Sequence, residues 1–378
     1  MMSHRSGTYR LFSRDPLRGK GADDRVLLRP ETGIQPVGFM NGIKEANGHK
    51  PLGLAHVFDP MFTAASRPEP DQLAFDLDAA LAPILSLQSR APDDAFSSSY
   101  LGTEREGNGI LISDDGLIVT IGYLIAEAET IILSANNGAT AHAHAIAYDY
   151  ETGFGLLRAA GDLGVKPIEL GNSAAVIEQE TLIIGARGGR GQAINAIVAS
   201  KREFAGYWEY MLDEAIFTTP PHPHWSGSAL IDDSGKLVGV GSLFVQDASE
   251  DDAPEAGNMF LPIDLLKFVL DDLLKFGHRS SPPRPWMGLY SMETFGRVLI
   301  TSISDKSPAE DAGVEPGDVL LAVNGLQVSG LADLYRKVWS AGDAGVTVSL
   351  GLLRDDQMIN ISVETADRSS FMKQPSSH

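Results

Sequence analysis

One serine in this chain stands in a setting that could support acyl transfer. Ser226 lies in the run His224-Trp-Ser226-Gly-Ser-Ala-Leu230, where a glycine directly follows the hydroxyl residue. A serine nucleophile needs a base that accepts its proton, a carboxylate that orients the base, and N–H groups that stabilise the oxyanion. The first question is therefore which residues supply these other groups.

Four histidines are candidates for the base, because histidine titrates near neutral pH: His142, His144, His222 and His224. The last two lie within four residues of Ser226, which leaves a relocated serine–histidine pair open, although adjacent loop positions rarely give the ~3 Å contact required. The four side chains also match zinc ligands by type. Nothing in the sequence brings the two pairs together, and we expect no metal and no other cofactor.

A second candidate motif is the glycine-rich run Gly185-Ala-Arg-Gly-Gly-Arg-Gly191. It lacks the Gly-Lys-Ser/Thr ending of a phosphate-binding loop, and no helical pattern follows it. We interpret it as a turn between strands.

The composition limits the class of protein. The 378 residues suffice for two or three domains, and 43% hydrophobic with 21% charged residues is typical of globular chains. A net charge of −20 disfavours nucleic acid as a partner, and the absence of cysteine excludes disulfides and thiolate chemistry. No apolar stretch approaches the roughly 18 residues of a membrane span, and the first thirty residues lack a secretory signal's apolar core. The sequence therefore predicts a cytoplasmic protein without a membrane span.

Short apolar runs separated by turn residues surround the candidate serine. A hairpin is expected over residues 109–113 and 117–120, with further strands at 130–134, 155–159, 181–185, 193–199, 214–218, 229–231 and 237–243. Many short strands at this spacing indicate an all-β barrel or sandwich. Apolar residues at helical spacing predict a helix over 73–89 and a closing helix over 264–275.

A proline-rich run, Ser281-Pro-Pro-Arg-Pro285, marks a boundary between two units. We expect one domain over residues 73–280 and a second over 284–366, with a helix at 331–340 in the second. Residues 1–72 lack apolar periodicity and are predicted to be disordered, and residues 367–378 form a tail.

The order of these pieces resembles the HtrA/DegP family over roughly residues 105–365. Gly107-Asn-Gly-Ile-Leu-Ile-Ser-Asp-Asp-Gly-Leu-Ile-Val-Thr120 resembles the hairpin that leads to the family's catalytic histidine. Ser234-Gly-Lys-Leu-Val-Gly-Val240 resembles the strand after the nucleophile, and Ser307-Pro-Ala-Glu-Asp-Ala-Gly-Val-Glu-Pro-Gly-Asp-Val-Leu-Leu-Ala-Val-Asn-Gly325 resembles a PDZ domain. The resemblance implies a mainly β chain, with a trypsin-like double β-barrel followed by an α+β PDZ domain.

The resemblance also locates the catalytic base and its carboxylate, and both are missing. The family's histidine position holds Tyr123 in the run Thr120-Ile-Gly-Tyr123, and its aspartate position holds Gly153. Asp149 and Glu151 lie nearby but out of register. Tyrosine has a pKa of about 10, so it is not a base at neutral pH without a large shift of that pKa.

The nucleophile position is retained as Ser226, but His224 replaces the glycine whose N–H contributes to the family's oxyanion hole. A backbone donor still exists there, although a side chain restricts its conformation. Loss of one oxyanion donor costs roughly 10²–10³ in rate, whereas loss of the base costs on the order of 10⁶. We therefore expect negligible proteolysis.

The PDZ groove is the remaining candidate site, because such grooves hold an extended peptide by its terminal carboxylate. By resemblance, the carboxylate loop is Trp286-Met287-Gly288-Leu289, leading into Tyr290, and Gly288 lets the carboxylate approach closely. The groove helix contributes Leu331, Leu334 and Val338, although some of these residues could face only the core.

The sequence thus predicts a non-proteolytic HtrA/DegP-like protein that binds C-terminal or unfolded peptide segments as a chaperone, adaptor or regulator. The resemblance implies a homo-oligomer, commonly a trimer, and a periplasmic location as the alternative to a cytoplasmic one. Two other functions stay open: a serine endopeptidase that uses Ser226 with a non-standard base, and a structural scaffold without a free groove.

Overall fold

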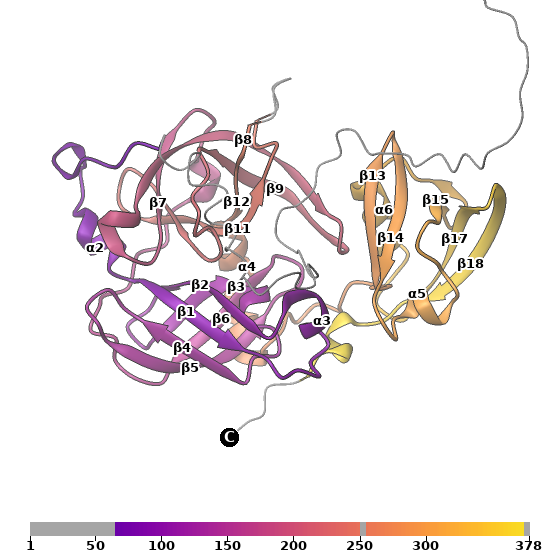
Figure 1. Cartoon of the computed structure of the whole chain (residues 1–378), viewed down its shortest axis with the longest axis horizontal. Helices are drawn as coiled ribbons and strands as arrows, with labels where there is room; N and C mark the ends of the chain where they lie inside the picture. The colour runs from indigo at the N-terminus through magenta and orange to yellow at the C-terminus, as the bar shows by residue number, and fades with distance from the viewer. Residues whose placement is uncertain (1–64, 250–254, 374–378) are drawn as a thin grey trace, which may run out of the picture. The chain divides into compact units, whose positions relative to one another are not determined.

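The structure is a computed structural model, and it describes residues 65–249 and 255–373. Within these ranges the strands form two closed barrels and one further sheet (Figure 1). Most of the segment predicted to be disordered, residues 1–72, and the end of the tail lie outside the described residues. The mainly β class with a double barrel and an α+β C-terminal unit is confirmed.

The first barrel consists of six antiparallel strands in the order β1-β2-β3-β6-β5-β4. Their bounds are β1 (Ile84–Arg90), β2 (Glu104–Leu111), β3 (Leu117–Ile121), β4 (Thr130–Ser134), β5 (Thr140–Tyr148) and β6 (Phe154–Ala159). Because β1 pairs with both β2 and β4, the sheet closes on itself and leaves no unpaired edge. Short helices, η1 (Pro70–Gln72), α2 (Leu77–Leu81), α3 (Ser98–Leu101) and η2 (Gly122–Leu124), lie before and between the strands.

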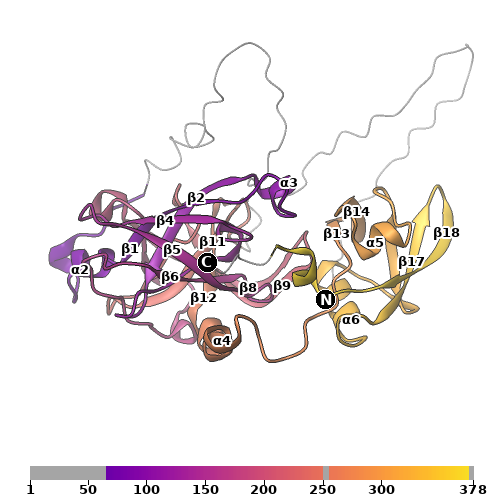
Figure 2. The same ribbon diagram turned by 90° about the horizontal axis from the view of Figure 1, so that it is seen from below.

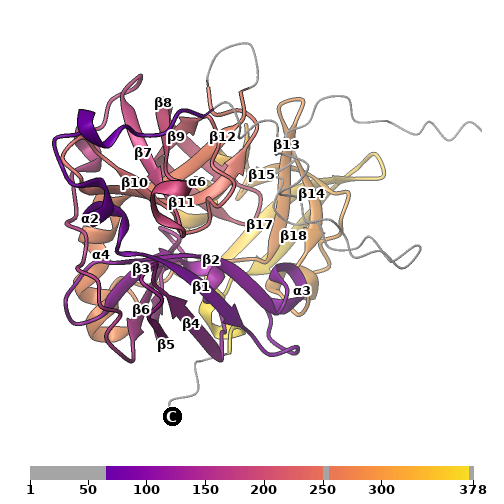
Figure 3. The ribbon, with the colours of Figure 1, turned by 60° about the vertical axis from the view of Figure 1, so that its left-hand side comes forward.

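The second barrel has the order β10-β11-β12-β9-β8-β7 (Figure 3). Its strands are β7 (Thr181–Gly185), β8 (Ile194–Gly206), β9 (Tyr210–Thr219), β10 (Ala229–Ile231), β11 (Leu237–Val245) and β12 (Gly257–Pro262), with η3 (Ser173–Ala175) and η4 (Gly189–Gln192) as short helical turns. The hairpin of β8 and β9 extends far beyond the strands predicted for it and turns through residues 207–209. Helix α4 (Ile263–Phe276) follows and packs against β5, β11 and β12 (Figure 2).

The helix predicted over residues 73–89 is wrong. Helix α2 ends at Leu81, and after Pro83 the chain continues as strand β1, which is buried between β2 and β4. Proline lacks an N–H and its ring clashes with the preceding helical turn, so the helix does not continue past Pro83 and the apolar run after it pairs with neighbouring strands instead.

The C-terminal unit is a sheet of six strands with a helix packed against it. Strands β13 (Leu289–Thr294), β14 (Arg297–Ile303), β15 (Val319–Val323), β17 (Thr347–Arg354) and β18 (Gln357–Glu364) lie in that order, and β16 (Leu326–Gln327) pairs with β15. Helices α5 (Pro308–Asp311) and α6 (Leu331–Trp339) connect the strands, and η5 (Arg368–Phe371) follows the sheet. Strand β13 lies at one edge of the sheet, so one side of its backbone has no partner strand within this sheet.

In the described part of the chain, no helix combines the length and the apolar character that crossing a membrane requires.

Candidate active site and peptide groove

The loop that carries Ser226 connects β9 to β10 and is fixed by Asn108 of β2. The buried Asn108 donates its backbone N–H to the Ser226 carbonyl at 2.8 Å, and its side-chain amide donates to the carbonyls of His224 and Ser226 at 2.9 and 2.8 Å. Its amide oxygen in turn accepts the N–H of Arg187 at 2.8 Å. Asn108 is therefore a positioning residue that the sequence analysis did not single out, although it lies in the run that carried the resemblance.

The glycine after the nucleophile is required by the backbone itself. Gly227 has φ +73°, and a Cβ atom placed on it would lie 2.0 Å from the carbonyl oxygen of Asn108. A side chain at Gly241 would likewise lie 2.1 Å from the Trp225 carbonyl oxygen. These glycines can therefore persist whether or not the site performs chemistry.

Tyr123, in the turn η2 after β3, lies directly against Ser226. The Tyr123 Oη and Ser226 Oγ atoms are 2.7 Å apart, and Tyr123 Oη also donates to the carbonyl of Ser242 at 2.7 Å. A phenol has one proton and a carbonyl can only accept, so the hydroxyl of Ser226 is the donor to Tyr123. Burial raises the pKa of Tyr123 well above its ordinary value.

This geometry gives Ser226 a neutral acceptor but no base. A neutral phenol could take the serine proton only by becoming a doubly protonated oxygen, and the phenolate that could act as a base is disfavoured by the raised pKa. Within the described ranges, Tyr123 is the hydrogen-bonding partner of the Ser226 hydroxyl.

Gly153 occupies the position where the resemblance expects an aspartate, and little room for a side chain exists there. Gly153 has φ +88°, and a Cβ atom would lie 2.9 Å from the hydroxyl oxygen of Tyr210, which donates to the Thr152 carbonyl at 2.7 Å. Gly153 and Tyr123 line the same cavity, and the Gly153 carbonyl accepts the N–H of Gly122, the chain neighbour of Tyr123, at 2.8 Å.

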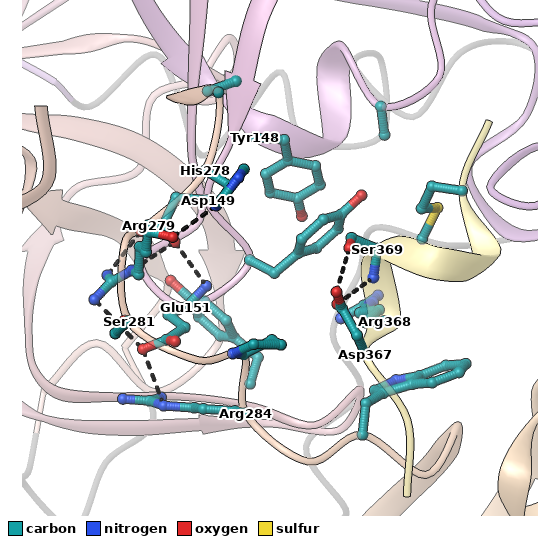
Figure 4. A pocket seen from close by; sticks show the side chains of 18 of the residues that line it. Tyr148, Asp149, Glu151, His278, Arg279, Ser281, Arg284, Asp367, Arg368 and Ser369 are labelled. Atoms are coloured by element: carbon teal, nitrogen blue, oxygen red, sulfur yellow. Dashed lines mark hydrogen bonds and ion pairs between the residues drawn. The ribbon is translucent and has the colours of Figure 1, made fainter. Parts of the chain in front are cut away.

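The two nearby carboxylates belong to a different pocket, of about 780 Å³ (Figure 4). Asp149 accepts from Nε and Nη2 of Arg279 at 2.8 Å each, and Glu151 pairs with Arg284 at 3.0 Å. Burial pushes the pKa of Asp149 upward, but the hydrogen bonds and charge of Arg279 outweigh it and hold the pKa below its usual value. Both carboxylates therefore anchor the linker after α4 and do not orient a catalytic base.

The oxyanion donor expected at position 224 is engaged elsewhere. The N–H of His224 donates to Nδ1 of His222 at 3.0 Å, and Nε2 of His222 lies 2.6 Å from the Gln192 carbonyl. A carbonyl only accepts, so Nε2 carries the proton of His222 and Nδ1 is free to accept. Burial lowers the pKa of His222 to about 4, which keeps this ring neutral. The expectation of an available donor at His224 is therefore corrected.

The positions of the four histidines test two other roles, a base for Ser226 and a metal site. Both ring nitrogens of His222 are occupied, so His222 cannot serve as the base of Ser226 in this arrangement. His142 and His144 lie exposed on β5 of the first barrel, whereas His222 and His224 lie in the loop of the second. Among the described residues, no group of three or more His, Cys, Asp or Glu side chains is placed to hold a metal ion.

The run 185–191 is a turn between β7 and β8 that contains the start of η4. Its two arginines form ion pairs, Arg187 with Glu106 at 3.2 Å and Arg190 with Asp78.

The predicted carboxylate loop of the PDZ groove is already in contact with a carboxylate. The N–H groups of Met287 and Leu289 donate to Glu209, at the tip of the β8–β9 hairpin, at 2.9 and 2.7 Å. Trp286 pairs with Ala366 in an isolated antiparallel bridge. Glu209 is a site residue that sequence reasoning missed, because it lies 80 positions from Leu289 in the chain.

Gly288 is needed for a reason other than the predicted approach of a ligand. It has φ +88°, and a Cβ atom would lie 2.3 Å from the Cβ of Ser307, which leaves no space for any side chain. Tyr290 is half-buried, with its ring 6.0 Å from that of Tyr207. The expected groove-helix residues are all buried in one apolar cluster: Leu331, Leu334 and Val338.

A cavity of about 850 Å³ extends from Tyr123 and Ser242 to β13 and β14. Most of its large lining side chains are aromatic, including Phe96, Tyr100, Tyr148, Tyr207, Trp208 and Tyr290.

Comparisons with known proteins agree with this architecture. A family model described as a trypsin-like peptidase domain matches residues 107–240, and one described as a PDZ domain matches residues 277–365. The chain is 23% identical over 278 residues to the periplasmic serine endoprotease DegP of Escherichia coli, covering 68% of this chain and 56% of that protein. The chain is a homologue of the HtrA/DegP serine proteases.

Two further relatives of this HtrA homologue are similar at the same level. Protease Do-like 1, chloroplastic, of Arabidopsis thaliana is 27% identical over 295 residues, covering 71% of this chain and 66% of that protein. The serine endoprotease DegS of Haemophilus influenzae is 28% identical over 228 residues, covering 58% of this chain and 64% of that protein. The chain thus spans between about half and two thirds of the length of these three relatives.

Proposed function

We propose that this chain is a non-proteolytic HtrA homologue that acts by binding peptide or misfolded segments through its PDZ domain, as a chaperone, adaptor or regulator. The observation that carries the proposal is the contact of Tyr123 with Ser226. The serine hydroxyl donates a hydrogen bond to a neutral phenol, which cannot act as a base. The hydrogen bond from the N–H of His224 to His222 supports the same conclusion, because this N–H is then not available as an oxyanion donor.

Two features support a binding role. Aromatic side chains line the large cavity beside Tyr123, and such rings offer much apolar contact area to a bound segment. The carboxylate loop of the PDZ unit has its N–H groups directed at a carboxylate, which is the arrangement that holds a chain end in this mode of recognition. We also propose that the chain self-associates, by analogy with the family.

The second candidate is a serine endopeptidase that uses Ser226. It is favoured by the names of the relatives, which are serine endoproteases, and by the retained hydroxyl at the nucleophile position.

Labelling of Ser226 with a fluorophosphonate, together with cleavage of unfolded casein, separates the two functions. We expect neither reaction for the wild-type chain, and no change in Ser226→Ala. Tyr123→Phe is a matched control, because it removes the phenol oxygen and keeps the ring. Labelling that vanishes in both Ser226→Ala and Tyr123→Phe would show that Tyr123 acts as a base and would overturn the proposal.

A further inference from the structure

The tip of the β8–β9 hairpin presents a buried carboxylate to the C-terminal unit. Glu209 is only 9% exposed, and its two carboxylate oxygens accept different N–H groups, Oε2 from Met287 and Oε1 from Leu289. These are the donors expected to hold the terminal carboxylate of a bound peptide. The side chain of Glu209 thus stands where the end of a foreign chain would stand.

The backbone before Glu209 also contacts β13 in the way that a bound peptide would. The N–H of Ser291 in β13 donates to the carbonyl of Tyr207 at 2.8 Å. Leu289 and Ser291 are two residues apart on β13, and their partners Glu209 and Tyr207 are two residues apart on the hairpin. This spacing of two is that of a strand added to a sheet edge, and β13 is the edge strand of its sheet.

Helix α6 encloses the hairpin tip from the other side. The hydroxyl of Tyr335 donates to the Gly206 carbonyl at 2.6 Å and accepts the N–H of Glu209 at 3.2 Å. Met211 is buried in the same apolar cluster as Leu331, on α6. The tip is therefore held by the carboxylate loop, by β13 and by α6, the three elements that form a PDZ peptide groove.

The backbone of Glu209 has a left-handed conformation. Its φ is +57°, a left-handed backbone that glycine adopts freely and that is unfavourable for other residues. The contacts of the carboxylate with the loop offset this cost. A glycine at this position would keep the turn and lose the two contacts.

We infer that residues 206–211 are an internal ligand of the PDZ groove, and that the groove accepts from other proteins a chain end of the same pattern. The partner would present a free terminal carboxylate at the place of the Glu209 carboxylate and an aromatic side chain two residues earlier, at the place of Tyr207. The ring of Tyr207 lies 6.0 Å from that of Tyr290 on β13, which provides the aromatic contact. This inference rests on the proposed peptide-binding function.

A partner must displace the internal segment before it can bind. Its apparent affinity is therefore its intrinsic affinity reduced by the fraction of molecules in which the groove is open. Weakening the internal contact should raise the apparent affinity for a partner's chain end and should leave the intrinsic affinity unchanged.

The test uses the full chain and a fluorescent peptide that ends in Gly-Tyr-Trp-Val with a free carboxyl group. Glu209→Gly should bind it about 10- to 100-fold more tightly than the wild type, since the two hydrogen bonds from Met287 and Leu289 that hold the closed form are lost. Tyr335→Phe should bind it about 3- to 10-fold more tightly by an independent route. Glu214→Gln, an exposed change on the same hairpin, should match the wild type, and the amidated peptide should bind to none of the four.

Hydrogen exchange at the N–H groups of Met287 and Leu289 is measured on the same proteins without peptide. We expect faster exchange in Glu209→Gly than in the wild type; equal exchange and equal peptide affinity would overturn the internal ligand. If exchange rises but no protein binds the peptide, the internal contact stands, while the proposed peptide-binding function and the partner inferred from it are refuted.

Discussion

Restoring a histidine at position 123 should fail to restore proteolysis. Tyr123→His supplies a base, but two further defects remain in the structure. Gly153, with its positive φ and with Tyr210 close by, provides no carboxylate to orient the new histidine. The N–H of His224 stays engaged with His222 and is not available to an oxyanion.

The magnitudes of these defects can be compared. A missing orienting carboxylate costs about 10⁴ in rate and a missing oxyanion donor about 10²–10³. If the two were independent, Tyr123→His would fall about 10⁶–10⁷ short of a complete site, or about 8–10 kcal/mol in the free energy of the transition state. Groups that act as a unit are not additive, so this figure is an upper bound.

A second substitution, His222→Phe, tests whether the oxyanion donor limits the site. Adding His222→Phe removes the acceptor of the His224 N–H while keeping a ring in the buried space. The double variant should label with a fluorophosphonate about 10²–10³ times faster than Tyr123→His alone. His222→Phe in the presence of Tyr123 is the control and should gain nothing, because the base is still absent.

The assay follows the labelling rate of Ser226 by mass spectrometry, with casein cleavage as a second measurement and circular dichroism to confirm folding. Efficient casein cleavage by Tyr123→His alone would refute the argument, since it would mean that the engaged donor and the missing carboxylate do not limit the site. A double variant that is no faster than Tyr123→His would show that His222 does not hold the oxyanion donor.

Two further predictions concern stability. Gly227→Ala should lower the free energy of unfolding by about 3 kcal/mol or more, because its Cβ would overlap the carbonyl of Asn108 and its φ is positive; a urea titration that shifts by less than ~1 kcal/mol would contradict this. Burial raises the pKa of Glu209 to about 7, although the N–H groups of Met287 and Leu289 and the charge of Arg368 act in the opposite direction. Because the folded pKa lies above the ordinary value of 4.5, the contribution of Glu209 to stability should be fully present below about pH 4.5 and fall as the pH rises through about 7. The thermal midpoints of the wild type and Glu209→Gly, compared from pH 5 to pH 8, should show it, and a difference independent of pH would contradict it.

Local patterns in the sequence were sufficient to predict several short elements. The expected strands at 130–134, 181–185 and 229–231 coincide with β4, β7 and β10, and the helix predicted at 331–340 is α6 apart from its last residue. These elements are short and bounded by turn residues, so their periodicity and their ends are both visible in the sequence. Strands β5 and β12 were not predicted, and the helix predicted over residues 73–89 overlooked the effect of Pro83.

The residue types at the catalytic positions were also readable from the sequence, because motif order alone aligned Tyr123, Gly153 and Ser226 with the family. Local sequence patterns do not show which hydrogen-bonding partner each polar group has in the folded chain. Asn108 and Ser226 are 118 positions apart, and Glu209 and Leu289 are 80 apart.

Tertiary structure alone decided that the N–H of His224 meets a neutral imidazole and that the carboxylate of Glu209 meets the carboxylate loop of the PDZ unit. Most buried polar groups are hydrogen-bonded, but only the folded chain decides which of several possible partners lies within reach. The sequence therefore determined that Tyr123 stands at the position where the resemblance expects a histidine. The folded chain determined that the tip of the β8–β9 hairpin contacts the carboxylate loop of the PDZ unit.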